Sequence, residues 1–161
     1  LDLAELVTST VEDFQVMAEE NSISISLDAP TEPVWVRGDK QRLRQLLFIL
    51  GDNACRYSNP GGHIEVALWV NGKEANFSLT DQGIGIPAHD LERIFDRHFR
   101  SQNALRSWED GTGLGLSMAK SILKAHGGGI TVTSIENSGS TFAITLPLIS
   151  VEQDDYQINV Q

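Results

Sequence analysis

Hydrophobic positions recur with two different periods along the chain, and these periods separate predicted helices from predicted strands. Apolar side chains follow helical spacing in residues 3–20, and again in residues 43–57, which follow Asp39, a residue typical of a helix N-cap. Apolar and polar residues alternate over 23–27, which predicts a strand. Residues 34–36 predict a second, short strand. The first part of the chain therefore combines both types of element.

The same mixture of periods continues to the end of the chain. Residues 63–70 and 75–80 predict a hairpin joined by Asn71-Gly72, the preferred pair for a type I′ turn. The other predicted elements are a glycine-bearing loop at 81–87, a short helix near 88–96, a polar loop at 101–112, a helix at about 114–126, and strands near 130–135 and 140–146. We expect an α+β fold with a mixed, largely antiparallel sheet and helices packed on one face.

Composition restricts the class of protein. The chain has 161 residues, of which 40% are hydrophobic, and these values predict a single globular domain. The net charge of −10 argues against a broad nucleic-acid surface, so no nucleic-acid partner is expected. Cys55 is the only cysteine, which excludes an internal disulfide and is typical of a reducing compartment. No stretch reaches the length of a membrane span, and the first residues do not resemble a signal peptide.

Candidate chemistry begins with the glycine-rich run Gly111-Thr112-Gly113-Leu114-Gly115-Leu116-Ser117, which opens a predicted helix. Its glycines expose backbone N–H groups, and a helix N-terminus adds a positive dipole end, a combination that suits phosphate. No Lys-Ser/Thr pair follows, so the run is not a P-loop, and it does not fit G-x-G-x-x-G. A turn that only caps the helix is the structural alternative.

Two further clusters carry polar groups that suit a nucleotide. Asn53, Arg56 and Tyr57 lie on one flank of the long predicted helix and offer a neutral oxygen for a hard cation, a phosphate partner and an aromatic ring. Asp81 follows a predicted strand in the run 81–87, where its carboxylate could accept a hydrogen bond from an exocyclic amine. The structural alternatives are a solvated helix face for the first cluster and an Asx-type turn for the second.

Together these segments carry a family resemblance. Asn53-Ala54-Cys55-Arg56-Tyr57-Ser58, Asp81-x-Gly83-x-Gly85-Ile86-Pro87, Ile94-Phe95-Asp96-Arg97-His98-Phe99-Arg100 and 111–117 appear in this order. They resemble the N, G1, F and G2 boxes of the ATP-binding catalytic domain of sensor histidine kinases. Four ordered boxes are far more specific than any one of them. The resemblance covers about residues 1–148.

The resemblance implies the Bergerat fold, a two-layer α/β sandwich that binds ATP and Mg²⁺ between its helical layer and a lid. It implies Asn53, Arg56 and Arg100 as the catalytic residues, with Asn53 as the Mg²⁺ ligand and the two arginines as contacts to phosphate. It places Asp81 at the adenine amino group and Tyr57 against the nucleotide. The other nucleotide contacts that it implies are Gly83, Gly85, Ile86, Arg97, Gly111, Thr112, Gly113, Leu114, Gly115, Leu116 and Thr141.

The resemblance also implies how the chain is organised. Residues 1–148 would form the catalytic domain, 1–20 the helix after a separate phosphoacceptor dimerisation domain, 101–112 the ATP lid, and 149–161 a disordered acidic tail. The γ-phosphoryl group would pass to a histidine of that separate domain, and from there to a response regulator. None of the chain's four histidines lies in the family's acceptor pattern, so the chain is not expected to autophosphorylate alone.

Further expectations concern the whole protein and the lid. The fragment is expected to be a monomer and its parent a homodimer, anchored in the bacterial inner membrane with this domain in the cytoplasm. Residues 101–110 are expected to be mobile without ligand and to become ordered when Mg·ATP binds.

The sequence departs from the family pattern at two positions. Ile49 stands where the N box often carries a first asparagine, which puts the Mg²⁺ and phosphate geometry in question more than adenine recognition. His98 replaces an aromatic residue of the F box, whereas Phe95 and Phe99 also fit core packing. Two alternatives stay open: another ATPase of the same superfamily, and a degenerate nucleotide-binding module with weak or no phosphotransfer.

Overall fold

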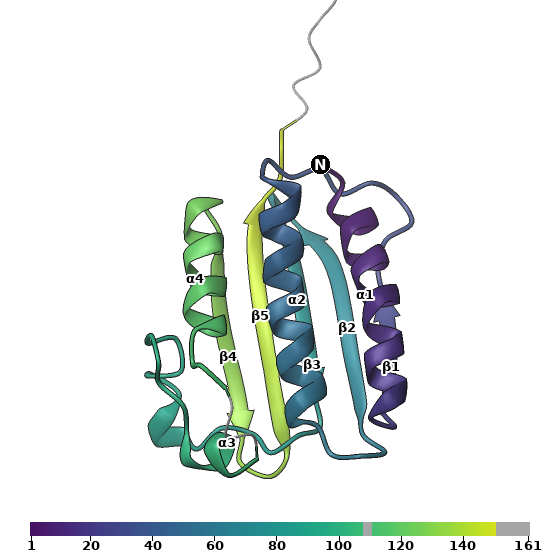
Figure 1. The fold of residues 1–161 in the computed structure, drawn as a ribbon. Coiled ribbons are helices and arrows are strands. Elements are labelled where there is room, and N and C mark those ends of the chain that lie inside the picture. Colours follow the sequence, from purple (N-terminus) through teal and green to yellow (C-terminus); the bar gives the residue numbers. More distant parts are fainter. Residues whose placement is uncertain (108–110, 151–161) are drawn as a thin grey trace, which may run out of the picture.

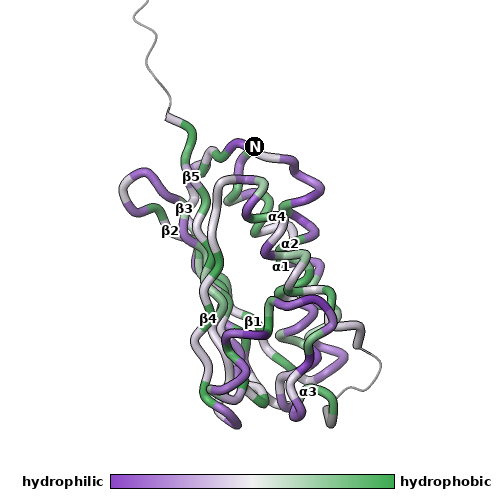
Figure 2. The backbone as a smooth tube through the Cα atoms, turned by 90° about the vertical axis from the view of Figure 1, so that its left-hand side faces the viewer, coloured by the Kyte–Doolittle hydropathy of each residue, from purple (hydrophilic) through white to green (hydrophobic). Residues whose placement is uncertain are grey.

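A five-stranded sheet forms one layer of the molecule, and helices cover one of its faces (Figures 1 and 2). This computed structural model describes residues 1–107 and 111–150. Its elements are α1 (Leu3–Glu20), β1 (Ser24–Asp28), α2 (Lys40–Tyr57), β2 (His63–Asn71), β3 (Glu74–Asp81), the 3₁₀ turn η1 (Ala88–Asp90), α3 (Gln102–Ser107), α4 (Gly115–Ala125), β4 (Gly129–Ile135) and β5 (Gly139–Pro147). The predicted two-layer α/β sandwich is confirmed.

The order of strands in the sheet is β1-β2-β3-β5-β4. β1 pairs with β2 in parallel, whereas β2–β3, β3–β5 and β5–β4 are antiparallel. The predicted mixed and largely antiparallel sheet is therefore confirmed. The register places Asp81 of β3 opposite Ser140 of β5, where β3 ends and β5 begins. Figure 1 shows α3 beside this end of the sheet.

Local side-chain chemistry fixes where the two long helices begin. The Asp2 carboxylate accepts from the backbone N–H of Ala4 at 2.9 Å, and the Asp39 carboxylate accepts from Gln41 at 2.8 Å. Such caps satisfy backbone donors that a helix leaves unpaired in its first turn. The helices then bury one apolar face on the sheet, with side chains such as Leu46 and Leu50 almost fully buried. Helical spacing of apolar residues predicted this packing correctly.

The His126 side chain, at the end of α4, connects this helix with the start of α2. Its Nε2 atom accepts from the backbone N–H of Asp39 at 3.0 Å, and its Nδ1 atom lies 2.7 Å from the carbonyl oxygen of Ile122. The end of α4 is thus attached to the N-cap of α2. A side chain on Gly38 would lie 2.5 Å from the His126 ring, so the glycine permits this approach.

Four sequence predictions need correction. Residues 34–36 form isolated bridges, Asp2 with Trp35 and Val36 with Leu148, rather than a strand. The predicted helix 88–96 is reduced to the single 3₁₀ turn η1, followed by irregular turns. Pro87 starts this turn, but Ile94 is the main apolar residue buried after it, so no continuous apolar face supports a longer helix.

The other two corrections concern a turn and a loop. The β2–β3 turn is centred on Gly72-Lys73 rather than on Asn71-Gly72. Gly72 alone of this pair has a positive φ, +61°, which is typical of a type II′ turn rather than a type I′ turn. The predicted loop 101–112 contains the helix α3. Residues 151–161, where most of the predicted disordered tail falls, lie outside the described residues.

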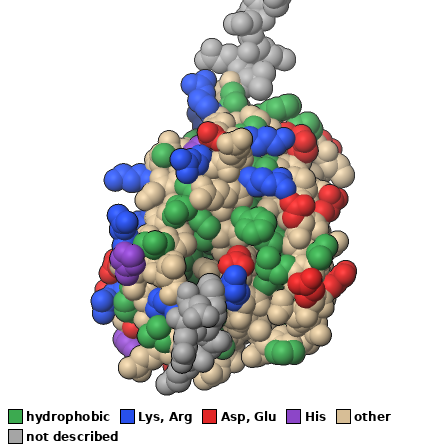
Figure 3. Space-filling view, in the orientation of Figure 1, with side chains coloured by type: hydrophobic (Ala, Val, Ile, Leu, Met, Phe, Trp, Pro, Cys, Tyr) green, Lys and Arg blue, Asp and Glu red, His purple; other side chains and the backbone are tan. Residues whose placement is uncertain are grey.

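Charge is unevenly distributed over the helical face. Residues 1–36 contain no Lys or Arg, and acidic side chains gather over α1, whereas Lys and Arg gather over α4 and one end of α2 (Figure 3). Within the described part of the chain, no helix is long and apolar enough to cross a membrane.

Candidate functional site

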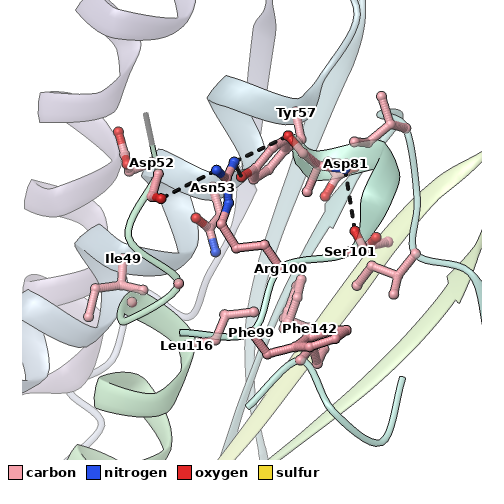
Figure 4. Close-up of a pocket in the computed structure, with 18 of the residues that line it drawn as sticks. Ile49, Asp52, Asn53, Tyr57, Asp81, Phe99, Arg100, Ser101, Leu116 and Phe142 are labelled. Atoms are coloured by element: carbon pink, nitrogen blue, oxygen red, sulfur yellow. Dashed lines mark hydrogen bonds between the residues drawn. The ribbon is translucent and has the colours of Figure 1, made fainter. Parts of the chain in front are cut away.

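A cavity of about 240 Å³ lies between the two layers (Figure 4). Its lining includes residues of α2, of β5 and of α3, the helix at the lower end of the molecule in Figure 1. We call one part of its wall the sheet end, which is formed by Asp81, Ile84, Gly85, Ile86, Ser140 and Phe142. We call the opposite part the α2 end, which is formed by Ile49, Asp52, Asn53, Tyr57, Arg100, Gly111, Thr112, Gly113, Gly115 and Leu116. Ile94, Phe99, Ser101 and Ala104 complete the lining.

A buried carboxylate dominates the sheet end. The Asp81 side chain is 7% exposed, and its Oδ1 atom accepts from the backbone N–H of Gly83 at 2.9 Å. Burial raises the pKa of the Asp81 carboxyl from 3.8 to about 6, although backbone hydrogen bonds from Gly83 and Ser140 lower it in part. The group is therefore mainly an anion at neutral pH and offers lone pairs to the cavity.

Two glycines allow the backbone after Asp81 to pack closely against its neighbours. A Cβ atom on Gly83 would lie 2.2 Å from the carbonyl oxygen of Tyr57, and one on Gly85 would lie 2.1 Å from that of Ile135. Gly85 also has a φ of +65°, which side-chain-bearing residues rarely adopt. The loop is held between α2 and the β4–β5 turn, and this fixes the position of Ile84 and Ile86 in the cavity wall.

The helix α2 supplies one wall of the cavity at successive turns. Tyr57 lies next to the glycine loop, because its carbonyl oxygen accepts from the Ile84 N–H at 3.0 Å. Asn53 lines the cavity one turn earlier, and Ile49 lies one further turn away. The Ile49 Cγ2 atom would be 3.2 Å from a Cβ atom on Gly115, so this part of α2 packs against the start of α4.

Arg56 and its neighbours on α2 face partly away from the cavity. The Arg56 Nε atom pairs with the Asp52 carboxylate at 2.9 Å, and Arg56 is not among the lining residues. Cys55 is buried on the core side of the same turn. Burial, with a smaller contribution from the Asp52 charge, raises the pKa of the Cys55 thiol to about 11.

Arg100 connects the α2 end of the cavity with α3 and the glycine-rich run. Its guanidinium donates to the carbonyl oxygens of Ala104 and Gly111 at 3.2 Å and 3.3 Å, and to the Tyr57 hydroxyl at 3.3 Å (Figure 4). A Cβ atom on Gly111 would lie 2.7 Å from the Arg100 guanidinium carbon. Glycine at 111 therefore lets the arginine cross the backbone of the run.

A second polar contact attaches α3 to the sheet end. The Asn103 Nδ2 atom donates to the carbonyl oxygen of Gly85 at 2.9 Å, and the Ser101 hydroxyl donates to Asn103 Oδ1 at 2.5 Å. Ser101 is 7% exposed and itself lines the cavity. The segment that begins α3 is thus held by the glycine loop at one point and by Arg100 at another.

Most of the residues predicted for the site meet at this cavity. The lining includes Asn53, Tyr57, Asp81, Gly85, Ile86, Arg100, Gly111, Thr112, Gly113, Gly115 and Leu116. Two further predicted residues lie next to the cavity. The backbone N–H of Gly83 donates to the Asp81 carboxylate, and the carbonyl oxygen of Leu114 accepts from the Met118 N–H in the first turn of α4. Arg97 lies in the wall of an adjacent open hollow, outside the cavity itself.

Thr141 lies on the opposite face of the sheet from the cavity. Side chains alternate between the two faces of a strand, and Thr141 pairs in register with Thr80, whose hydroxyl lies 2.9 Å from its own. Its neighbours Ser140 and Phe142 face the cavity instead. The alternating burial along β5 shows that Ser140, rather than Thr141, is the hydroxyl beside Asp81. The sequence indicates the same alternation, because the apolar residues 142, 144 and 146 lie on the same face of the strand as residue 140.

The α2 end includes the Asn53 amide, whose neutral oxygen suits a hard cation. Among residues 1–107 and 111–150, no group of three or more His, Cys, Asp or Glu side chains could hold a metal ion by itself. Mg²⁺ is ordinarily bound through few protein ligands together with phosphate oxygens, so Asn53 fits a metal that arrives with a phosphate ligand. The cavity therefore combines an acceptor-bearing apolar end with an end that carries an amide and a guanidinium.

Comparison with known proteins identifies the family. Residues 38–150 match the model of histidine kinase-, DNA gyrase B- and HSP90-like ATPases. The chain belongs to this ATPase family. The sensor histidine kinase WalK of Bacillus subtilis is 38% identical over 142 residues, which are 87% of this chain and 23% of WalK. The adaptive-response sensory kinase SasA of a Synechocystis species is 38% identical over 149 residues, 92% of this chain and 38% of SasA.

Solved structures place the chain among the histidine kinase members of this ATPase family. The mycobacterial sensor histidine kinase MprB superposes with a TM-score of 0.81 at 31% identity, over 92% of this chain and 97% of that one. The nucleotide-free catalytic domain of the histidine kinase ThkA gives a TM-score of 0.78 at 28% identity, over 91% and 93% of the two chains. The chain spans less than two fifths of the length of the curated relatives named above.

Several lining residues were not predicted as site residues. This group consists of Asp52, Ile84, Ile94, Ser101, Ala104, Ser140 and Phe142, together with Ile49 and Phe99, which depart from or fit the family pattern in other ways. Ile84 and Ser140 could have been found, because each is adjacent to a predicted residue. Ser101 and Ala104 fall in the predicted lid, but their contact with the cavity depends on how α3 folds over it.

Proposed function

We propose that this chain is the ATP-binding catalytic domain of a sensor histidine kinase, which binds Mg·ATP in the cavity between its two layers. One observation carries the proposal: the buried Asp81 carboxylate faces the same cavity as Asn53 and Arg100. A flat, amine-bearing base suits the apolar sheet end, and a triphosphate suits the α2 end. The relative ShkA was solved in full length as a complex with AMPPNP, and it resembles this chain with a TM-score of 0.77 at 26% identity.

At the sheet end, the carboxylate of Asp81 would accept a hydrogen bond from the exocyclic amine of adenine. Ile84, Ile86 and Phe142 would exclude water from the ring, and this strengthens a polar contact made beside them. Gly85 leaves no side chain between the backbone and the ligand. The sheet end therefore supplies recognition rather than chemistry.

At the α2 end, Asn53 would hold Mg²⁺ through its amide oxygen, and Arg100 would contact terminal phosphate oxygens. The metal would neutralise charge that develops on the phosphates. Arg56 pairs with Asp52 through Nε and does not line the cavity, so its contact with phosphate would require its side chain to turn toward the ligand. Arg97 could reach phosphate only from the adjacent hollow.

The reaction proposed is transfer of the γ-phosphoryl group to an imidazole nitrogen. The bond between the γ-phosphorus and the β–γ bridging oxygen breaks, its electron pair leaves with ADP, and a nitrogen–phosphorus bond forms. The imidazole releases its proton to solvent or to a base of the acceptor domain. Such transfers depend mainly on positioning and charge stabilisation, which Asn53 and Arg100 would provide.

The rest of the parent protein is also part of the proposal. The acceptor histidine would lie on a separate dimerisation domain, and the phosphoryl group would then pass to a response regulator. The parent would be a homodimer anchored in the inner membrane, with this domain in the cytoplasm. Residues 1–148 would be the catalytic domain, with α1 following the acceptor domain.

Two measurements test the function. Calorimetric titration of the chain with ATP in the presence of Mg²⁺ is expected to show one binding site. Incubation with γ-labelled ATP and the phosphoacceptor domain of the parent is expected to give an acid-labile, base-stable phosphohistidine on that domain. The chain without the acceptor domain provides the control and is expected to stay unlabelled. Absence of nucleotide binding would contradict the proposal.

Ile49 favours a second candidate, a nucleotide-binding module that transfers no phosphoryl group. An apolar side chain lies at the α2 end, one turn from Asn53, and packs against the start of α4. Nucleotide binding without any phosphohistidine on the acceptor domain would support this candidate. Ile49→Asn is then expected to raise transfer, because it adds an amide next to the proposed metal ligand.

A further inference from the structure

Two serine hydroxyls lie together at the sheet end of the cavity. Ser134 of β4 and Ser140 of β5 are directly opposite in register, and their Oγ atoms are 2.8 Å apart. Ser140 lines the cavity next to Asp81 and is 7% exposed, whereas Ser134 does not line it. Ser134 can therefore influence a ligand only through its neighbours.

The hydrogen bonds of Ser134 decide which of the two hydroxyls donates to the other. The backbone N–H of Ile86 donates to Ser134 Oγ at 2.7 Å, and the Ser134 hydroxyl donates to the carbonyl oxygen of Gly139 at 2.9 Å. A hydroxyl has one proton and two lone pairs. All three contacts of Ser134 are hydrogen bonds at the same time only if its one proton goes to the Gly139 carbonyl, because that oxygen cannot donate. In this arrangement the remaining lone pair of Ser134 accepts the proton of Ser140.

The polarity of the sheet end follows from this arrangement. With its only proton held by Ser134, Ser140 presents lone pairs alone to the cavity. The ionised Asp81 carboxylate also presents only acceptors, and its Oδ1 atom already takes the Gly83 N–H. Ile84, Ile86 and Phe142 carry no polar side-chain atoms. Among the described lining residues of the sheet end, the side chains thus offer acceptors and no donor.

We propose that Ser134 is a positioning residue that, through Ser140, makes the site select a purine with an exocyclic amino group over one with a carbonyl in its place. The inference rests on the proposed function and deepens it, since it assigns base selection to a hydroxyl outside the cavity. An amino group brings two donors to a wall of acceptors. A carbonyl oxygen brings lone pairs to the same wall, and a buried acceptor left without a donor lowers affinity.

The test compares the dissociation constants of Mg·ATP and Mg·ITP by calorimetry at pH 8. ITP has a carbonyl in place of the amino group and a proton on N1, and both differences are the same for every variant of the protein. The wild-type chain is expected to prefer ATP. In Ser134→Ala the hydroxyl of Ser140 is free to rotate and donate, so the ratio of the ITP and ATP constants is expected to fall about fivefold. Ser134→Thr restores a hydroxyl and is expected to restore the ratio. Ser78→Ala, on the outer face of β3, provides the matched control.

A double mutant separates this effect from a loss of structure. Ser134 also holds the backbone of Ile86, and its loss could weaken binding of both nucleotides together. If Ser134 acts through Ser140, then Ser134→Ala leaves the ratio unchanged in a Ser140→Ala background. An equal fall of the ratio in both backgrounds would overturn the inference.

The outcomes distinguish this inference from the proposed function. A wild-type chain that binds neither nucleotide contradicts the proposed function. A wild-type chain that prefers ATP, with the same ratio in Ser134→Ala, overturns the role of Ser134 and leaves the proposed function standing.

Discussion

The two ends of the cavity differ in what holds their polar groups. At the sheet end, Asp81 and Ser140 are oriented by backbone groups and by Ser134, elements of the sheet and of the glycine loop. At the α2 end, Arg56 pairs with Asp52 and Arg100 donates to Tyr57 and to two carbonyl oxygens. Recognition of the base would thus be preformed, whereas phosphates would compete with acceptors of the protein for the two arginines.

The largest effect on ATP affinity is expected from replacing the carboxylate at the sheet end. Asp81→Asn keeps the size of the side chain but turns a donor toward the exocyclic amine, so the affinity for ATP is expected to fall by about 100-fold or more. Calorimetry measures the dissociation constant, and Asp28→Asn, at the exposed end of β1, is the matched control. An unchanged constant in Asp81→Asn would contradict adenine recognition by this residue.

The same substitution is expected to alter how stability depends on pH. Because the pKa of Asp81 is raised to about 6 in the folded state, its contribution to stability is present below the unfolded value of 3.8 and is lost as pH rises through 6. Asp81→Asn is therefore expected to be more stable than wild type at pH 8, by on the order of 2 kcal/mol. Urea unfolding checks this, and the difference should shrink steadily toward pH 4. A pH-independent difference would show that ionisation of Asp81 is not its cause.

A smaller effect is expected at the α2 end, where phosphate competes with protein acceptors. Arg100→Ala is expected to weaken ATP binding about tenfold and adenosine binding much less, because charge-assisted contacts with phosphate are lost while contacts with the base remain. Arg37→Ala removes an exposed arginine ahead of α2 and serves as the control. Equal losses for ATP and adenosine would mean that Arg100 supports the fold of the cavity rather than the phosphates.

The smallest effect is expected where α3 meets the sheet end. Asn103→Ala removes the donor to Gly85, so ATP affinity is expected to fall about fivefold and amide hydrogen exchange in residues 101–107 to quicken. Asn21→Ala, which removes a comparable amide contact to Met17 at the end of α1, is the control. Unchanged exchange in Asn103→Ala would show that this contact does not hold α3. Ordering of residues 101–110 by Mg·ATP stays a prediction for the same measurement.

Periodicity predicted the parts of the fold that depend on burial of a continuous apolar face. The helices at 3–20 and 43–57 and the strands of the sheet were found because many apolar residues repeat in phase. The helix predicted near 88–96 failed because too few of its residues are buried. Residues 34–36 form no strand because they pair through single bridges with two different segments, at Asp2 and at Leu148, instead of running along one neighbouring strand.

Site residues were predictable where family boxes and strand phase agree. Asp81, Asn53 and Arg100 meet at one cavity as the boxes imply. The alternation of β5 turns Ser140 inward and Thr141 to the opposite face of the sheet, so at this strand the box pattern and the strand phase disagree. Ser134 could not be predicted from the sequence, because its relevance depends on the register between β4 and β5 and on the direction of the hydrogen bond between two hydroxyls. Such details follow from tertiary geometry rather than from local sequence.

The reactivity of the single cysteine, Cys55, can report how often the helix α2 opens. Cys55 lies buried in α2 between Asn53 and Arg56, and burial keeps the pKa of its thiol at about 11, so the native state presents almost no thiolate to an alkylating reagent. Alkylation of Cys55 therefore requires α2 to separate from the sheet. The rate of alkylation, with and without nucleotide, would report how often the helix that carries Asn53 opens, without any label or added residue.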